Sequence, residues 1–136
     1  MEYNTRIPDF VIKTTTAEDV AVIVDFINSL AEYEKLTSEA VVTKDVIAKS
    51  LFVKKAAEAV LGCYKGEPVC FAVFFQNFST FLGRPGLYLE DLFVKPEYRG
   101  RGYGKTMLAF LAWLAKKREC VRFEFAVLDW NKPALD

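Results

Sequence analysis

The chain has 136 residues, enough for one domain with a sizeable hydrophobic core, and we expect a single domain over residues 1–136. Hydrophobic residues make up 52% and charged residues 26%, a composition that excludes an intrinsically disordered protein. Eighteen Lys and Arg balance eighteen Asp and Glu, so a protein that binds nucleic acid through a general basic face is not expected.

The cysteine and histidine content limits the disulfides, catalytic groups and metal sites that the chain can form. The three cysteines lack C-x-x-C spacing, which argues against a disulfide framework, favours a cytoplasmic protein and predicts small buried hydrophobes. The chain has no histidine, which excludes catalysis by imidazole, and we predict no metal site. Residues 1–9 are polar, and no run of about 18 apolar residues follows, so no membrane partner is expected.

The first part of the chain predicts a strand followed by two helices. The strand is expected over residues 10–13. Thr16 is placed to cap a helix over residues 20–33, where apolar side chains recur at helical spacing. Residues 35–42 predict a loop, and Thr43 is placed to cap a second helix that extends to Phe52.

The middle of the chain predicts strands. Residues 59–64 and 69–75, joined by a short Gly/Pro segment, are typical of a hairpin. We expect a loop over residues 77–86, which contain several turn formers, and a further strand over residues 87–94. Most of the twelve phenylalanines should be core residues rather than pocket residues, including Phe74, Phe75, Phe78 and Phe81.

The last part predicts a helix between two strands. Pro96 cannot donate to a strand ladder, so residues 95–98 should end the preceding strand. Residues 103–118 are apolar nearly all round, which predicts a well-buried helix, and residues 121–128 predict a strand parallel to an earlier one. A turn and the start of a helix follow. The order β-α-α-β-β-β-α-β indicates an α/β (α+β) fold with a mixed sheet.

A glycine-rich turn over residues 99–105 precedes the buried helix. Its glycines permit positive φ, and the first amides of the helix lack internal partners, so a phosphate or pyrophosphate is the natural occupant. The P-loop pattern fails because Arg99 stands where it requires glycine, and the dinucleotide pattern fails at Lys105. The pattern R-x-x-G-x-G is satisfied by Arg99, Gly102 and Gly104.

This pattern, with the strand before it and the apolar helix after it, resembles the acetyl-CoA signature of the GNAT superfamily of N-acetyltransferases. Within that superfamily, residues 30–34, 87–94, 98–100 and 130–133 are similar to the diamine (spermidine/spermine) N-acetyltransferases. The resemblance implies a mixed, mostly antiparallel sheet flanked by helices. It also implies acetyl-CoA as co-substrate, a small-molecule amine as acceptor and a homodimer.

The resemblance further implies the residues of the site. An alkylamine has a pKa of about 10, so a base must remove its proton at neutral pH, directly or through water. The resemblance assigns Glu90 either this role or that of binding the amine. Strand alternation sends Glu90 and Asp91 to opposite faces unless a bulge intervenes. Substrate binding is implied for Tyr33, Glu34, Asp91 and Glu124. Cofactor binding is implied for a strand, the glycine turn and a segment near the end of the chain: Leu92, Phe93, Val94, Arg99, Gly100, Arg101, Gly102, Tyr103, Gly104, Lys105, Asn131, Pro133 and Ala134.

The family continues beyond Asp136 with a helix, which carries a tyrosine acid, and with two strands. We therefore expect a domain truncated at its carboxyl end relative to that family. Two classes of function remain open from the sequence. One is an amine N-acetyltransferase. The other is a truncated or inactive CoA-binding module with a structural or partner-binding role.

Overall fold

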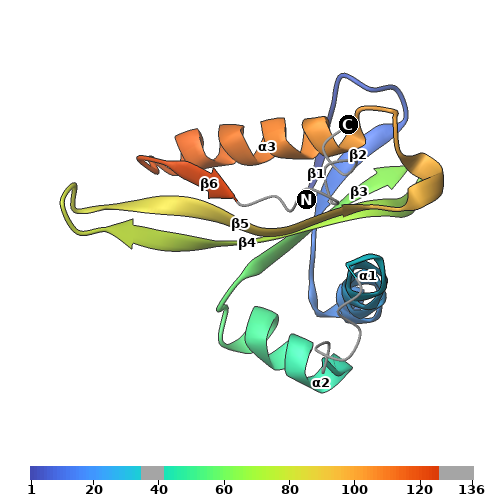
Figure 1. Ribbon diagram of the computed structural model, residues 1–136, viewed down its shortest axis with the longest axis horizontal. Coiled ribbons are helices and arrows are strands. Elements are labelled where there is room, and N and C mark those ends of the chain that lie inside the picture. Colours follow the sequence, from blue (N-terminus) through green and yellow to red (C-terminus); the bar gives the residue numbers. More distant parts are fainter. Residues whose placement is uncertain (35–41, 126–136) are drawn as a thin grey trace.

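A six-stranded sheet separates two layers of helices in the computed structural model, which describes residues 1–34 and 42–125 (Figure 1). α3 (Tyr103–Lys117) covers one face, and α1 (Val20–Tyr33) and α2 (Lys44–Ile47) lie on the other. The strands follow one another across the sheet in sequence order: β1 (Glu2–Asn4), β2 (Phe10–Thr14), β3 (Glu58–Tyr64), β4 (Glu67–Ser79), β5 (Arg84–Val94) and β6 (Phe123–Phe125).

The pairing of these strands confirms the mixed sheet. Neighbours from β1 to β5 run antiparallel. β5 and β6, which precede and follow α3 in the chain, run parallel to each other. The predicted strand–turn–helix–strand crossover is therefore correct. β1 was not predicted, because its residues are polar. It pairs only with β2, at an edge where polar side chains remain in contact with water.

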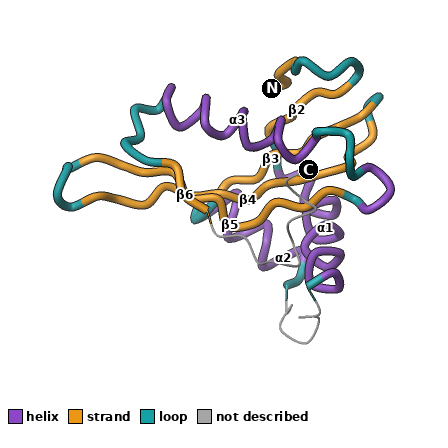
Figure 2. Tube along the Cα trace, turned by 45° about the horizontal axis from the view of Figure 1, so that its top comes forward, coloured by secondary structure: helices purple, strands orange, loops and turns teal. Residues whose placement is uncertain are grey.

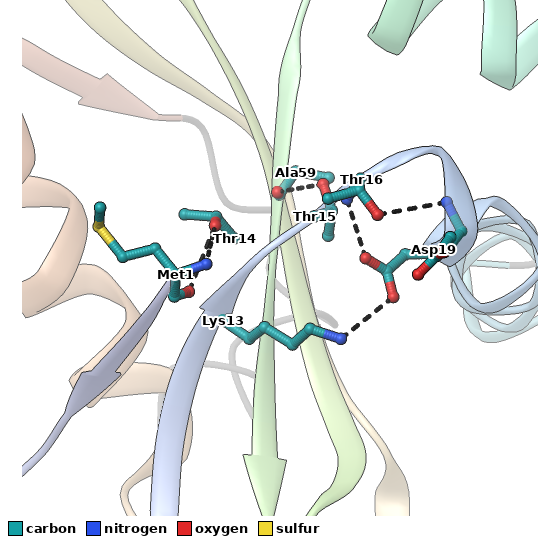
Figure 3. A network of polar contacts seen from close by, with 8 residues as sticks. Met1, Lys13, Thr14, Thr15, Thr16, Asp19 and Ala59 are labelled. Atoms are coloured by element: carbon teal, nitrogen blue, oxygen red, sulfur yellow. Dashed lines mark hydrogen bonds and ion pairs between the residues drawn. The ribbon is translucent and has the colours of Figure 1, made fainter.

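A polar network fixes the start of α1 (Figure 3). Thr16 caps a short 3₁₀ turn, η1 (Ala17–Asp19), that leads into α1. The Thr16 N–H donates to Asp19 Oδ2 over 2.9 Å, and Lys13 Nζ lies 3.3 Å from Asp19 Oδ1. Thr16 is thus a cap as predicted, although it caps the 3₁₀ turn rather than α1 itself.

The second helix changes type along its length. Thr43 Oγ1 accepts a hydrogen bond from the Val46 N–H over 3.2 Å, which confirms the predicted cap. After α2, the chain continues as a π-helical segment, η3 (Ala48–Val53), before it enters β3. The predicted extent of the helix is close to the observed one. The wider turns of η3 were not predicted.

The β4–β5 hairpin is longer than predicted. β4 continues to Ser79 and β5 begins at Arg84, so the expected loop over residues 77–86 was wrong. The connection between the two strands is confined to residues 80–83, and the other turn formers lie within the strands. Pro85 is tolerated in β5 because its carbonyl accepts from Val121 over 2.9 Å, so its main chain faces away from β4 and no ladder donor is lost.

α3 packs on the sheet through a single stripe. Tyr103, Met107, Leu111 and Ala115, spaced four residues apart, are buried against the sheet. Trp113, on another side of the helix, is 44% exposed. The prediction of burial all round was therefore wrong, because a helix on the outside of a sheet buries only one face.

The phenylalanines divide between the core and the surface. Phe26 of α1 stacks on Phe71 of β4 with ring centroids 5.0 Å apart, and Phe74 is buried against α3. Phe78 and Phe81, however, are 61% and 100% exposed. The expectation of burial was wrong for these two, because the hairpin extends beyond both helical layers (Figure 2).

Three further findings concern the described residues alone. None of their helices combines the length and apolar content needed to cross a membrane. No group of three or more acidic or cysteine side chains among them could hold a metal ion. All three cysteines are free, and Cys63 and Cys70 are buried as predicted, whereas Cys120 is half-buried.

Candidate functional site

The glycine turn between β5 and α3 presents main-chain donors. Gly100 and Gly102 adopt φ values of 79° and 83°, which other L-residues reach only with strain, and Gly102 forms the N-cap of α3. Within the described parts of the chain, no N–H of residues 100–105 donates a hydrogen bond, and the first helical donor is Thr106, to Gly102 O over 3.0 Å. The turn therefore directs unpaired donors outward at the positive end of the helix dipole.

The main-chain direction at the end of β5 follows from one hydrogen bond. Lys95 N–H donates to Val69 O over 2.9 Å, next to the pair formed by Val94 and Cys70. In an antiparallel ladder, this pattern makes the Val94–Cys70 pair a non-hydrogen-bonded one, so the N–H and C=O of Val94 face away from β4. Leu92 has the same direction by alternation.

This end of β5 has an open edge. β6 pairs only with the earlier part of β5, so no described strand lies beside residues 90–94. The outward groups of Leu92 and Val94 are on that edge, where Val94 O accepts from Arg99 Nε over 2.9 Å. Phe93 differs, because its main chain faces β4 and its side chain is buried beneath α1. An extended molecule could therefore lie along this edge in the place of a neighbouring strand.

A β-bulge brings two carboxylates to the same face. The register with β4 shifts between Leu89 and Asp91, which leaves Glu90 without an opposite residue. Leu89 and Leu92 both belong to the cluster packed against α3. The two residues between them therefore both lie on the opposite face, toward α1. The exception to alternation that the sequence left open is the arrangement observed.

Asp91 has the strongest electrostatic perturbation in this region. Burial, together with the smaller effect of the negative charges of Glu90 and Glu34, raises the pKa of Asp91 from 3.8 to about 6. Burial also raises the pKa of Glu34, which follows the end of α1. These carboxylates therefore repel one another, and a bound cation would relieve that repulsion.

Arg99 connects the glycine turn with the end of α1. Its guanidinium carbon lies 4.2 Å from the centre of the Tyr33 ring and 5.2 Å from that of Phe93. Its Nη2 is buried and has no hydrogen-bond partner among the described residues. A buried donor of this kind is costly and indicates an acceptor from a bound molecule. The motif predicted a role for Arg99, but no signal in the sequence predicted its contact with Tyr33.

Two predicted site residues make other contacts. Glu124 is exposed on β6, and its Oε1 lies 2.9 Å from Arg122 Nε, so its described partner is a neighbouring arginine. The Tyr103 ring stacks on Phe10 with centroids 4.2 Å apart and belongs to the core. Only the main chain of Tyr103 can therefore contribute to the turn.

The remaining predicted residues flank the turn or lie outside the described chain. Arg101 and Lys105 are exposed, and the Arg101 guanidinium lies 5.0 Å from the centre of the Tyr98 ring. Gly104 is buried in the first turn of α3. Asn131, Pro133 and Ala134 lie outside the described residues, as does the predicted turn and helix start around them.

Comparison with known proteins assigns the family. The model of the acetyltransferase (GNAT) family matches residues 24–136. The chain belongs to the GNAT acetyltransferase family. This membership confirms the resemblance found in the sequence, the fold class and the prediction of an N-acetyltransferase.

Individual relatives agree with this assignment. The thialysine N-epsilon-acetyltransferase of Caenorhabditis elegans is 35% identical over 93% of this chain and 78% of its own length. The L-ornithine N5-acetyltransferase of Arabidopsis thaliana is 41% identical over 48% of this chain and 29% of its own length. Among solved structures, a ribosomal-protein-alanine N-acetyltransferase from Brucella melitensis has the same fold, with a TM-score of 0.78. That similarity covers 92% of this chain and 85% of that one, at 21% identity.

Proposed function

We propose that this GNAT acetyltransferase moves the acetyl group of acetyl-CoA to a primary amine of a small di- or polyamine, with Glu90 as the base or water relay and no metal. The observation that carries the proposal is an open strand edge with outward donors beside a cluster of carboxylates. We also propose that the protein acts as a homodimer, as the family resemblance implies, and that it is cytoplasmic, as its cysteine usage suggests.

The fit of acetyl-CoA rests on donors that the described chain leaves unused. The N–H groups of residues 100–105 would hold its diphosphate at the start of α3. Leu92 and Val94 would pair with its pantetheine arm in the manner of an added strand. Arg99 Nη2 is a buried donor that fits an acceptor on the same molecule. When bound, acetyl-CoA supplies an activated acetyl thioester.

The carboxylates fit an amine acceptor. An alkylammonium ion would be attracted to Asp91 and Glu34, whose mutual repulsion it reduces. Glu90 is exposed on the bulge beside the open edge, where it can accept the ammonium proton directly or through a water molecule and release it to solvent. The neutral amine that remains would be the nucleophile, and the proton that its nitrogen loses on forming the amide would balance the CoA thiolate, which leaves as a free thiol.

The test combines turnover and binding on the full chain. Release of free thiol from acetyl-CoA is followed with putrescine, spermidine, lysine, thialysine and ornithine, and CoA binding is measured by calorimetry. Glu90→Gln should lower kcat by about 100-fold or more while the Kd for CoA stays unchanged. Glu97→Gln, which alters an exposed glutamate of η4 (Pro96–Tyr98), is the matched control and should retain both values.

Each alternative result has a defined meaning. Binding of CoA without thiol release for any amine would support the CoA-binding module instead. Full turnover in Glu90→Gln would remove Glu90 from the mechanism. Failure to bind CoA would refute the assignment of the glycine turn.

A further inference from the structure

We infer that the free edge of β4 over residues 75–79 pairs with the same segment of a second copy of this chain, and that the two copies form a two-fold symmetric dimer with one continuous sheet. This inference does not depend on the catalytic proposal. It rests on the length of the edge, the direction of its main-chain groups and the absence of charged side chains within the segment itself.

The edge exists because β4 is longer than β3. The β4–β5 hairpin projects from the sheet at the end remote from the glycine turn (Figures 1 and 2). β3 begins at Glu58, which lies opposite Phe74. Within the described chain, no strand therefore lies beside β4 from residue 75 to residue 79, and the other side of β4 is occupied by β5.

The hydrogen bonds of β5 establish which main-chain groups of β4 point outward. Two hydrogen bonds join β5 to the chain segment that leads into β6. Leu87 N–H donates to Arg122 O over 2.9 Å, and Pro85 O accepts from Val121 N–H over 2.9 Å. Both residues therefore face β6, so their partners on β4, Gln76 and Phe78, are in non-hydrogen-bonded pairs with β5. The N–H and C=O groups of Gln76 and Phe78 consequently face the free edge.

These two residues allow a self-complementary register. A two-fold axis beside Asn77 places Gln76 of one copy opposite Phe78 of the other, and each such antiparallel pair exchanges two hydrogen bonds. Phe78 O has one long contact in the single chain, 3.4 Å from Arg122 Nη2. In the same register Phe75 lies opposite Ser79. These two residues are the ends of the free edge, because β3 pairs with β4 up to Phe74 and the hairpin turn begins after Ser79.

The composition of the segment fits a second copy rather than a charged partner. In a two-fold interface the same patch faces itself, so a charged residue close to the axis would lie near the like charge of its own counterpart. Residues 74–83 carry no charge at all. Exposed edge strands are usually protected by charges or bulges, and residues 75–79 contain neither a charged side chain nor a bulge. The segment and the hairpin turn that follows it also expose large apolar side chains, since Phe78 on the edge and Phe81 and Leu82 in the turn are 61%, 100% and 64% exposed.

Gln76→Pro tests the edge without disturbing the hairpin. Proline removes an N–H that faces the free edge and not β5, so the intramolecular ladder remains intact. By light scattering after gel filtration, the wild-type chain should have twice its 15.5 kDa mass, and the variant should have the single mass. Circular dichroism checks that the fold is retained. Val46→Lys, at an exposed apolar site on α2, is the control and should stay dimeric.

Two further variants decide the matter if Gln76→Pro does not fold. Phe78→Lys places like charges across the interface and should also give the single mass. Asn77→Cys should form a disulfide-linked dimer on mild oxidation, because non-hydrogen-bonded partners have Cα atoms about 4.5 Å apart, whereas Val46→Cys should not. A wild-type monomer at all concentrations overturns the inference, as does a dimer that survives both Gln76→Pro and Phe78→Lys or an Asn77→Cys variant that fails to cross-link.

Discussion

Replacement of Asp91 by asparagine should stabilise the protein at neutral pH. Burial, with smaller contributions from the negative charges of Glu90 and Glu34, raises the pKa of this carboxyl from 3.8 to about 6. A carboxyl whose pKa is higher in the folded than in the unfolded state holds its proton more tightly when folded. Stability therefore falls as the pH rises from 3.8 to about 6, and the full cost is present above that range.

The size of the effect follows from the two pKa values. Each pKa unit corresponds to about 1.4 kcal/mol, so ionised Asp91 costs about 3 kcal/mol above pH 6. Asn has nearly the same shape and carries no charge. Asp91→Asn should therefore raise the free energy of unfolding by up to that amount above pH 6 and have little effect below pH 3.8.

Urea denaturation of both proteins across this pH range measures the difference directly. Asp25→Asn, which alters an exposed carboxylate on α1, is the matched control and should change the free energy of unfolding by less than about 0.5 kcal/mol at every pH. An Asp91→Asn protein that is less stable than the wild type above pH 6, or a difference that does not vary with pH, would refute the reasoning. Retention of a costly carboxylate is typical of a site where function opposes stability.

Three other substitutions test separate parts of the structure. Gly102→Ala forces a side chain into a conformation with φ of 83°, so it should cost about 1–2 kcal/mol in urea denaturation and weaken CoA binding in calorimetry; unchanged values for both would contradict the assigned turn geometry. Met107→Ala leaves a cavity beneath α3 and should cost about 2–5 kcal/mol, and a smaller loss would indicate that α3 packs loosely. Glu58→Gln breaks the bidentate contact with Arg118, at 2.6 and 2.8 Å. Both side chains are partly exposed, so the loss should stay below about 1 kcal/mol and shrink at high salt, and a larger loss would contradict this.

The elements predicted correctly are those whose signals are local. The periodicity of α1, the caps at Thr16 and Thr43 and the glycines before α3 all depend on residues within a few positions of one another. One error arose in the β4–β5 hairpin, where the segment contains more turn-forming residues than its short turn needs, so the loop was predicted to be too long. Other errors arose where apolar composition was interpreted as burial, as for Phe81 and Trp113.

In the candidate site, too, the features that depend on nearby residues were predicted, whereas those that depend on contacts between distant segments were not. The motif located the glycine turn, because the positive φ of Gly100 and Gly102 requires glycine within a short segment. The side on which Glu90 lies depends on a one-residue shift in the register between β4 and β5, which neither strand encodes alone. The contact of Arg99 with Tyr33 depends on where α1 ends above the sheet.

By itself, the amino-acid sequence determined the family, the mixed α/β architecture and the position of the proposed phosphate-binding turn, because each depends on short-range conformational preferences or on a compact motif. Only the tertiary structure decided which backbone edges stay unpaired, that Glu90 and Asp91 share a face, and that Asp91 lies near Glu34 and is costly to ionise. These properties depend on strand register and on the packing of α1 against the sheet. They are set by contacts between segments that are distant in the chain and become neighbours only when it folds.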